Sequence, residues 1–129
     1  MKLLLDTHIL LWVAAKPECL SKQALALIEA DSNDLYFSSA SLWEIVIKQG
    51  LDRPDFHADA SVLYRGLTDN GYHELSVTSR HALAVANLPK HHKDPFDRIL
   101  IAQAMSEGFT LITADKLITL YDGPILFVG

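Results

Sequence analysis

The sequence has one cysteine, no long uninterrupted hydrophobic run and no excess of basic residues. Because a single cysteine, Cys19, cannot form a disulfide within the chain, nothing points to a secreted domain held by disulfides. No apolar stretch reaches the length of about 18 residues that a membrane helix needs, so we expect no membrane span. Asp6 and His8 interrupt the apolar run near the N-terminus, which argues against a signal peptide and favours a cytoplasmic protein.

The charge balance is acidic. Eleven Lys and Arg residues stand against sixteen Asp and Glu residues, which gives a net charge of −5. A protein held on nucleic acid by bulk charge would be basic, so we do not expect that mode of binding. Binding through a bound cation or a local basic patch stays open. Half of the 129 residues are apolar, which is enough for a sizeable core and predicts one domain over residues 1–129.

Short apolar strands alternate with helices along the chain. We expect strands at about 3–5, 35–37, 73–77, 110–113 and 125–128. We expect helices at about 7–15, 40–49, 58–69, 79–88, 95–107 and 115–121, a further helix that begins at Ser21, and loops at 51–57 and 89–94. This alternation predicts an α/β fold of three layers, with helices on both faces of a mostly parallel sheet of about five strands.

Four acidic residues are expected at one edge of this sheet. The carboxyl ends of parallel strands and the amino ends of the following helices share an edge, and ligands bind there. Asp6 and Asp115 follow strands, whereas Glu44 and Asp97 lie early in helices. Asp94 is expected to be the cap of the helix that contains Asp97.

Each of these carboxylates also has a purely structural interpretation. Asp6 can cap a helix, and Asp115 can be a turn residue. Glu44 can pair with Lys48 four residues on, or close a capping box with Ser41. Taken together, however, four such charges at one edge would repel one another, and a shared cation would relieve the repulsion.

The chemistry of such a cluster is that of a hard cation. An all-oxygen donor set without cysteine selects Mg²⁺ or Mn²⁺. A site of this kind holds phosphate oxygens, activates a water molecule, or does both, so phosphodiester hydrolysis is the expected reaction. The sequence does not decide between one metal ion and two.

Four segments, in this order and spacing, resemble the PIN-domain family and, more narrowly, the VapC-type toxins of type II toxin–antitoxin systems. They are residues 4–8, 41–48, 94–104 and 111–115. The resemblance implies a Mg²⁺- or Mn²⁺-dependent endoribonuclease that leaves a 5′-phosphate and a 3′-hydroxyl. It also implies a homodimer and a small cognate antitoxin that blocks the site. The residues that match the family's acidic set and its accompanying polar residues are Asp6, Glu44, Asp97, Asp115, Thr7 and Thr113.

Basic residues near this set are candidates for contacts with RNA. Lys48 and Arg98 are expected either to contact phosphates or to serve as ordinary surface charges that pair with nearby carboxylates. Lys90 and Lys93 flank two histidines in the most basic segment, residues 90–93, which either helps to hold RNA or is a solvated loop. Because the two histidines are adjacent, we do not expect them to share a zinc ion.

Trp12 and Trp43 are expected in the core, with a share in a dimer contact as the alternative. A phosphatase of the haloacid dehalogenase type needs a second aspartate where His8 stands, and a receiver domain needs an acidic pair and a lysine that this chain lacks. The alternatives that stay open are a non-catalytic PIN-like scaffold for RNA or protein, and a PIN nuclease of RNA processing.

Overall fold

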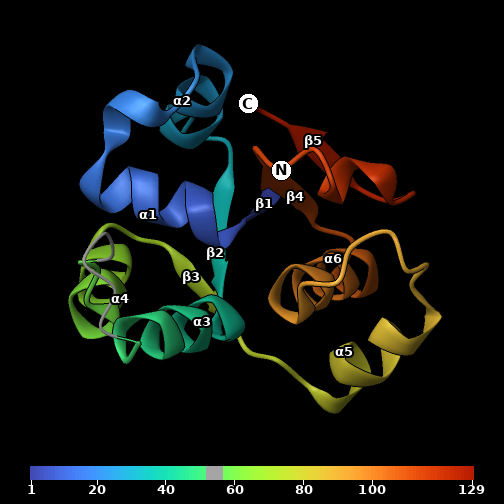
Figure 1. The fold of residues 1–129 in the computed structure, drawn as a ribbon. Helices are drawn as coiled ribbons and strands as arrows, with labels where there is room; N and C mark the ends of the chain where they lie inside the picture. The colour runs from blue at the N-terminus through green and yellow to red at the C-terminus, as the bar shows by residue number, and fades with distance from the viewer. Residues whose placement is uncertain (52–56) are drawn as a thin grey trace.

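The computed structural model describes residues 1–51 and 57–129. In these residues five parallel strands form one sheet in the order β3-β2-β1-β4-β5, so the first strand of the chain lies at the centre (Figure 1). The strands are β1 (Lys2–Leu5), β2 (Asp34–Ser38), β3 (His73–Leu75), β4 (Thr110–Thr113) and β5 (Ile125–Phe127). The expected parallel sheet is confirmed.

Six α-helices surround the sheet in the described part of the chain. They are α1 (Thr7–Ala15), α2 (Lys22–Glu29), α3 (Ser39–Gln49), α4 (Ala60–Asp69), α5 (Ser79–Ala84) and α6 (Pro95–Glu107). Single 3₁₀ turns lie at Pro17–Cys19, Val85–Asn87 and Ile118–Leu120. A short polar side chain accepts a hydrogen bond from the first turn of each α-helix, which fixes where each one begins. These N-caps are Asp6, Ser21, Ser38, Asp59, Thr78 and Asp94.

The sheet separates two hydrophobic cores. In β1, Leu3 and Leu5 point into the core formed with α1, α2, α3 and α4, whereas Leu4 points into the core formed with α5 and α6. This is the alternation that a strand with both faces buried must show. The arrangement confirms the three-layer fold, and it places the carboxyl ends of β1 and β4 side by side.

Several expected elements are shorter than the sequence suggests. The strand expected over 73–77 ends at Leu75, which pairs with Ser38, the last residue of its neighbour β2. The helix that begins after Thr78 ends at Ala84 and passes into a 3₁₀ turn, and the helix expected over 115–121 is a single 3₁₀ turn. Most of the loop expected over 51–57 lies outside the described residues.

The prediction that Trp43 lies in the core is wrong. The buried stripe of α3 consists of Ala40, Ser41, Glu44 and Ile45, and Trp43 points away from it with 63% of its surface exposed. Its ring packs edge-on against Phe96 at the start of α6, with ring centroids 5.4 Å apart. Trp12 is half-buried against the core, as expected. No helix in the described residues combines the length and the apolar character of a membrane span.

Candidate active site

Asp6 stands where β1 ends and α1 begins, and both of its carboxylate oxygens are engaged. Oδ1 accepts a hydrogen bond from the Ile9 backbone N–H at 2.8 Å, which confirms Asp6 as the N-cap of α1. Oδ2 accepts one from the Thr113 hydroxyl on the adjacent strand β4. Only 3% of Asp6 is exposed, and this burial raises the pKa of its carboxyl while the bonds from Thr113 and Ile9 oppose the rise.

Asp97 lies in the first turn of α6, three residues after its cap. Asp94 Oδ1 accepts hydrogen bonds from the backbone N–H groups of Phe96 at 2.8 Å and Asp97 at 3.3 Å, so the expected cap is confirmed. Burial raises the pKa of Asp97 to about 7, and the charges of Asp94 and Asp6 add to the rise, whereas the hydrogen bond to His92 lowers it. Asp97 is therefore only partly ionised near neutral pH.

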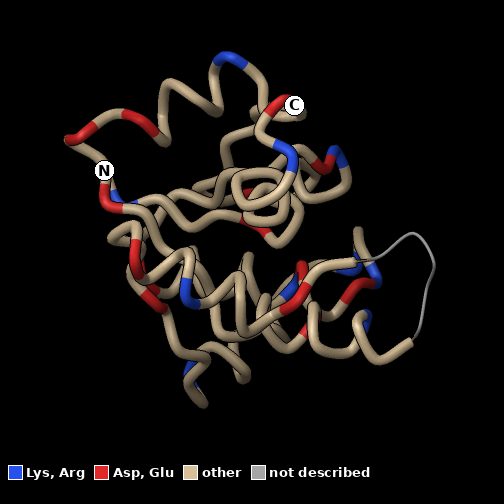
Figure 2. Tube along the Cα trace, turned by 90° about the vertical axis from the view of Figure 1, so that its left-hand side faces the viewer, with Lys and Arg blue, Asp and Glu red and all other residues tan. Residues whose placement is uncertain are grey.

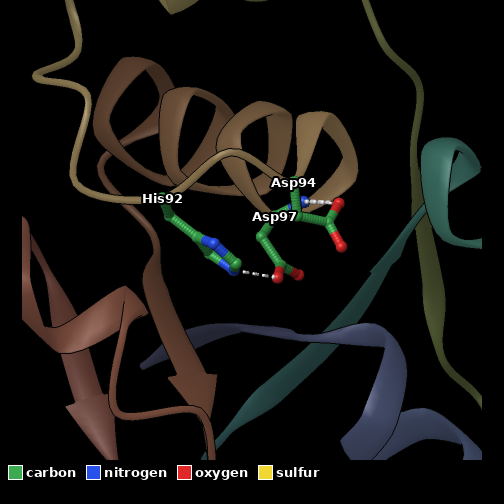
Figure 3. A group of neighbouring side chains, drawn as sticks. All are labelled: His92, Asp94 and Asp97. Atoms are coloured by element: carbon green, nitrogen blue, oxygen red, sulfur yellow. Dashed lines mark hydrogen bonds and ion pairs between the residues drawn. The ribbon is translucent and has the colours of Figure 1, made fainter.

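His92 joins two of the carboxylates. Its Nε2 lies 2.7 Å from Asp97 Oδ2 and 3.5 Å from Asp115 Oδ2, and Figure 3 shows the ring pointing at Asp97. Asp115 follows β4, and its backbone N–H donates to the Thr113 hydroxyl at 3.0 Å, the same hydroxyl that donates to Asp6. One imidazole and one hydroxyl thus gather Asp6, Asp97 and Asp115 into a single group, called here the carboxylate cluster.

Glu44 lies in the buried stripe of α3 and is 5% exposed. Its Oε2 forms an ion pair with Lys48 Nζ at 2.8 Å, which confirms the expected pairing. Its Oε1 is buried and has no hydrogen-bond partner in the described residues. The Thr7 hydroxyl donates to Ser41 Oγ at 2.9 Å and ties the start of α1 to α3, so Ser41 does not close a capping box with Glu44. In residues 1–51 and 57–129, no hydrogen bond or ion pair joins Glu44 directly to the carboxylate cluster.

The basic residues expected to contact RNA lie in different settings. Lys48 is committed to Glu44, and Lys90 and Lys93 are exposed in the loop before α6. Along the residues that the structure describes, Figure 2 shows Lys and Arg scattered among the acidic residues, without one continuous basic stripe. Arg98 is expected from the sequence to pair with Glu44 or Asp94 if it does not contact phosphates, and in the described residues it forms an ion pair with neither.

Arg98 holds the loop before α6 in place. Its guanidinium donates to the backbone carbonyls of Pro89 at 2.8 Å and Val85 at 3.2 Å. It also donates to the Tyr121 hydroxyl at 3.0 Å, and that hydroxyl accepts from the His92 backbone N–H at 2.9 Å. The structure therefore places Arg98 as an internal support of the segment that carries His92.

His92 and Tyr121 are the two site residues that sequence reasoning missed. In the sequence, His92 is one of two adjacent histidines in a basic loop, and Tyr121 is an ordinary aromatic residue eight residues before Gly129. The signal for His92 is its spacing, two residues before the cap Asp94 and five before Asp97. No comparable signal marks Tyr121, because its contact with the loop depends on the tertiary fold.

The donor set fits a divalent cation. His92, Asp94 and Asp97 each offer a ligand atom, and these atoms all lie within 4.8 Å of one another. The buried, unpartnered Oε1 of Glu44 is an oxygen donor of the kind that a cation satisfies. The raised pKa values of Asp6 and Asp97 have burial as their main cause, and a bound cation would stabilise the ionised form of both.

Comparison with known proteins places these residues in a family. The family model of the PIN domain matches residues 3–123. Ribonuclease VapC22 from Mycobacterium tuberculosis is 27% identical over 114 residues, which cover 88% of this chain and 86% of that relative.

Solved structures share the fold. The chain matches VapBC2 from Rickettsia felis, bound to a DNA fragment from its promoter, with a TM-score of 0.72 and 17% identity over 98% of this chain and 97% of that one. It matches DNA-bound VapBC from Salmonella typhimurium with a TM-score of 0.67 and 16% identity over 100% and 99% of the two chains. It also matches VapBC-5 from M. tuberculosis, described as a toxin–antitoxin system, with a TM-score of 0.65 and 18% identity over 98% and 97%.

Proposed function

The chain belongs to the PIN-domain family, and on that premise we propose that it is a divalent-metal-dependent endoribonuclease, the toxin of a type II toxin–antitoxin pair. The observation that carries the proposal is the carboxylate cluster, Asp6, Asp97 and Asp115, gathered at the carboxyl ends of β1 and β4. A partly buried group of carboxylates of this kind needs a positive partner at neutral pH, and Mg²⁺ or Mn²⁺ supplies one that also binds phosphate oxygens.

The four acidic residues have separate tasks in this proposal. Asp6, Asp97 and Asp115 would hold the cation, and Glu44 would add its free oxygen. When bound, the divalent cation orients phosphate oxygens and lowers the pKa of the attacking water. Thr113 links the Asp6 carboxylate to the backbone N–H of Asp115 through its hydroxyl. Attack by water, rather than by the RNA 2′-hydroxyl, would leave the 5′-phosphate and 3′-hydroxyl that the family resemblance implies.

The residues around the cluster would bind and support the RNA segment. Lys90 and Lys93 are exposed beside the cluster, and we assign them contacts with the phosphate backbone. Lys48 would contribute to this only indirectly, because its ammonium group is held by Glu44. Arg98 acts by fixing the loop that carries Lys90 and His92.

An apolar groove offers a site for the antitoxin. A cavity of about 720 Å³ lies between α1, α2 and α4, and Leu11, Ile28 and Leu63 are among the side chains that line it. VapBC-5 from M. tuberculosis, which shares this fold, is described as a member of a family of toxin–antitoxin systems. Because α1 is capped by Asp6 at one end and lines the groove at the other, an antitoxin segment docked there would lie within about 14 Å of the cluster, the length of α1. An apolar face on that segment would match the lining.

The exposed side of α3 offers a face for the homodimer. Trp43, Val46 and Ile47 are large apolar side chains that point to solvent on this helix. A second copy of the chain that covered them would remove this apolar surface from water. We expect light scattering to show a dimer for the wild type and a monomer for Val46→Glu, and a wild-type monomer at micromolar concentration would contradict the assignment.

The test of the ribonuclease proposal is cleavage of structured RNA with Mn²⁺ present or absent. We expect the wild type to cleave only with Mn²⁺, and Asp6→Asn to be at least about 100-fold slower, because it loses a negative ligand but keeps a helix-capping oxygen. Asp59→Asn, which changes the capping carboxylate of α4, is the matched control and should cleave normally. Full activity of Asp6→Asn would overturn the proposed site. Absence of cleavage by the wild type across structured RNAs would favour the scaffold alternative.

A further inference from the structure

We propose that His92 is a metal ligand, so that the site binds its cation through an imidazole nitrogen as well as through carboxylates. A site of this kind selects Mn²⁺ over Mg²⁺ more strongly than carboxylates alone would. This inference rests on the proposed metal-dependent function and specifies the ion that the site selects.

The distances around His92 Nε2 match those between two ligands of one ion. Neighbouring ligands of an octahedral ion lie about 3.0 Å apart when the metal–ligand bonds are about 2.1 Å long. Nε2 lies 2.7 Å from Asp97 Oδ2 and 3.5 Å from Asp115 Oδ2, values on either side of that separation. Asp94 adds a ligand atom within 4.8 Å of the ligand atoms of His92 and Asp97. Opposite ligands of such an ion lie about 4.2 Å apart. A small movement of the Asp94 carboxylate toward His92 and Asp97 would therefore bring it to a ligand position of the same ion.

The backbone of His92 is held in place before any ion binds. Its N–H donates to the Tyr121 hydroxyl at 2.9 Å, and Arg98 donates to the same hydroxyl at 3.0 Å. Arg98 follows Asp97 directly in α6 and also binds the Pro89 carbonyl, so one side chain links the His92 loop to the helix of its carboxylate partner. The side chain of His92 is only 14% exposed, and a ligand fixed in this way loses little freedom on binding.

The nitrogen donor decides which ions are favoured. Mg²⁺ is bound almost entirely by oxygen and keeps several water molecules, whereas imidazole suits transition ions better. The neighbouring His91 is exposed, and its ring packs against Tyr121 with centroids 5.2 Å apart. The chain therefore supplies a matched control, a second histidine in the same loop whose ring forms no hydrogen bond or ion pair with the carboxylate cluster in the described residues.

The decisive experiment is pulsed electron paramagnetic resonance on Mn²⁺ bound to the full-length chain. We expect nitrogen-14 coupling typical of imidazole in the wild type and in His91→Gln, and its loss in His92→Gln with Mn²⁺ still bound. Labelling the wild-type histidines with nitrogen-15 should change the coupling, which tests the ligand type without any substitution. Bound Mn²⁺ without nitrogen coupling in the wild type would overturn the role of His92 and leave the ribonuclease proposal standing. Failure of Mn²⁺ to bind at all would overturn both.

Selectivity gives an independent measurement. Isothermal titration of Mg²⁺ and Mn²⁺ should show that the preference for Mn²⁺ falls by roughly tenfold in His92→Gln, the size expected when a group at a metal site is lost. In His91→Gln the preference should stay at the wild-type value. An unchanged ratio of the two dissociation constants in a folded His92→Gln variant would contradict the proposal.

Discussion

Asp97 has a carboxyl pKa near 7, which lowers the free energy of unfolding at neutral pH and yet suits a metal site. Its folded-state pKa of about 7 is raised from 3.8, chiefly by burial. Between these two values the folded chain holds a proton that the unfolded chain releases, so the free energy of unfolding falls as the pH rises through this window. Above pH 7 the free energy of unfolding is lowered by the full cost of burying the ionised carboxylate, unless a bound cation offsets that cost.

This cost predicts a pH-dependent effect of Asp97→Asn on stability. The variant keeps the shape of the side chain and removes the charge at every pH. In EDTA at pH 8, the melting temperature of the variant should exceed that of the wild type by roughly 5 °C. At pH 5 the difference should be much smaller, because Asp97 of the folded wild type is then protonated and carries no buried charge. Thermal melts followed by circular dichroism at both pH values measure the difference. The exposed Asp69→Asn is the control, and an equal difference at both pH values for Asp97→Asn would contradict the burial argument.

The same variant should lose ribonuclease activity. Asp97→Asn removes a negative ligand while the Asp94 cap still fixes the start of α6, so we expect a fall in cleavage rate of at least about 100-fold with the fold retained. Rates on a structured RNA with Mn²⁺, with circular dichroism on the same samples, give the comparison, and Asp69→Asn should behave as wild type. A folded Asp97→Asn variant with full activity would remove Asp97 from the site.

At this scale the sequence predicts residues whose position follows from local chemistry. Asp6 and Asp94 are predictable because a cap must precede a helix, and Asp97 lies at a fixed spacing from its cap. His92 is not predictable in the same way, because a loop residue has no periodicity to give its direction. Its orientation depends on Tyr121, almost thirty residues away in the sequence.

At the scale of elements, α1 has two functions at its two ends. Its first turn is capped by Asp6 within the carboxylate cluster, and its second half lines the apolar groove. A partner docked in the proposed groove would therefore make its docking contacts outside the carboxylate cluster, yet close enough for another part of it to block the site. Binding of the partner and cleavage of RNA are consequently separable by substitution.

We predict that Val62→Glu separates them. Val62 is exposed on α4 and lines the groove, so a charge there would disfavour an apolar partner segment. Co-expressed with its small partner, the wild type should co-purify with it and lose its toxicity. Val62→Glu should bind at least about tenfold more weakly and stay toxic, with RNA cleavage unchanged.

The matched control for this prediction is Leu83→Glu. Leu83 is exposed on α5, which covers the other face of the sheet, so the substitution should leave partner binding unchanged. The toxin assignment itself would be refuted if the wild-type chain were harmless when expressed alone and active on RNA only together with another subunit.

The elements also differ in how well the sequence predicts them. The apolar run 3–5 and the capped segment 94–107 are predicted nearly to the residue, because burial on both faces and cap chemistry are local properties. Trp43 is mispredicted because its helix is apolar on several sides, and only the neighbours α4 and α6 decide which side is buried. Composition alone does not contain that information.

For the whole molecule, we predict that Mg²⁺ or Mn²⁺ stabilises the fold and that EDTA reverses the effect. The carboxylates are close together only in the folded chain, so a cation that binds there favours the folded state. At a hundredfold excess over the dissociation constant the gain is about 2.7 kcal/mol. That gain corresponds to a rise in melting temperature of roughly 5–15 °C for a domain of this size.

The double variant Asp6→Asn, Asp97→Asn provides the test of location. It should be slightly more stable than the wild type without metal, because mutual repulsion is removed, and should show no rise with Mn²⁺. Thermal melts in EDTA and in a Mn²⁺ series measure both effects. If the cation stabilises the double variant as much as the wild type, it binds elsewhere on the protein.

The position of β1 at the centre of the sheet has a consequence for biosynthesis. β1 leaves the ribosome first, yet its neighbour β4 and the residue Asp115 emerge about a hundred residues later. A nascent chain that ends before β4 therefore lacks Asp115, and with it the complete carboxylate cluster. The lining of the groove, in contrast, ends at Tyr72. The residues that line the proposed docking groove are therefore synthesised before the last carboxylate of the cluster.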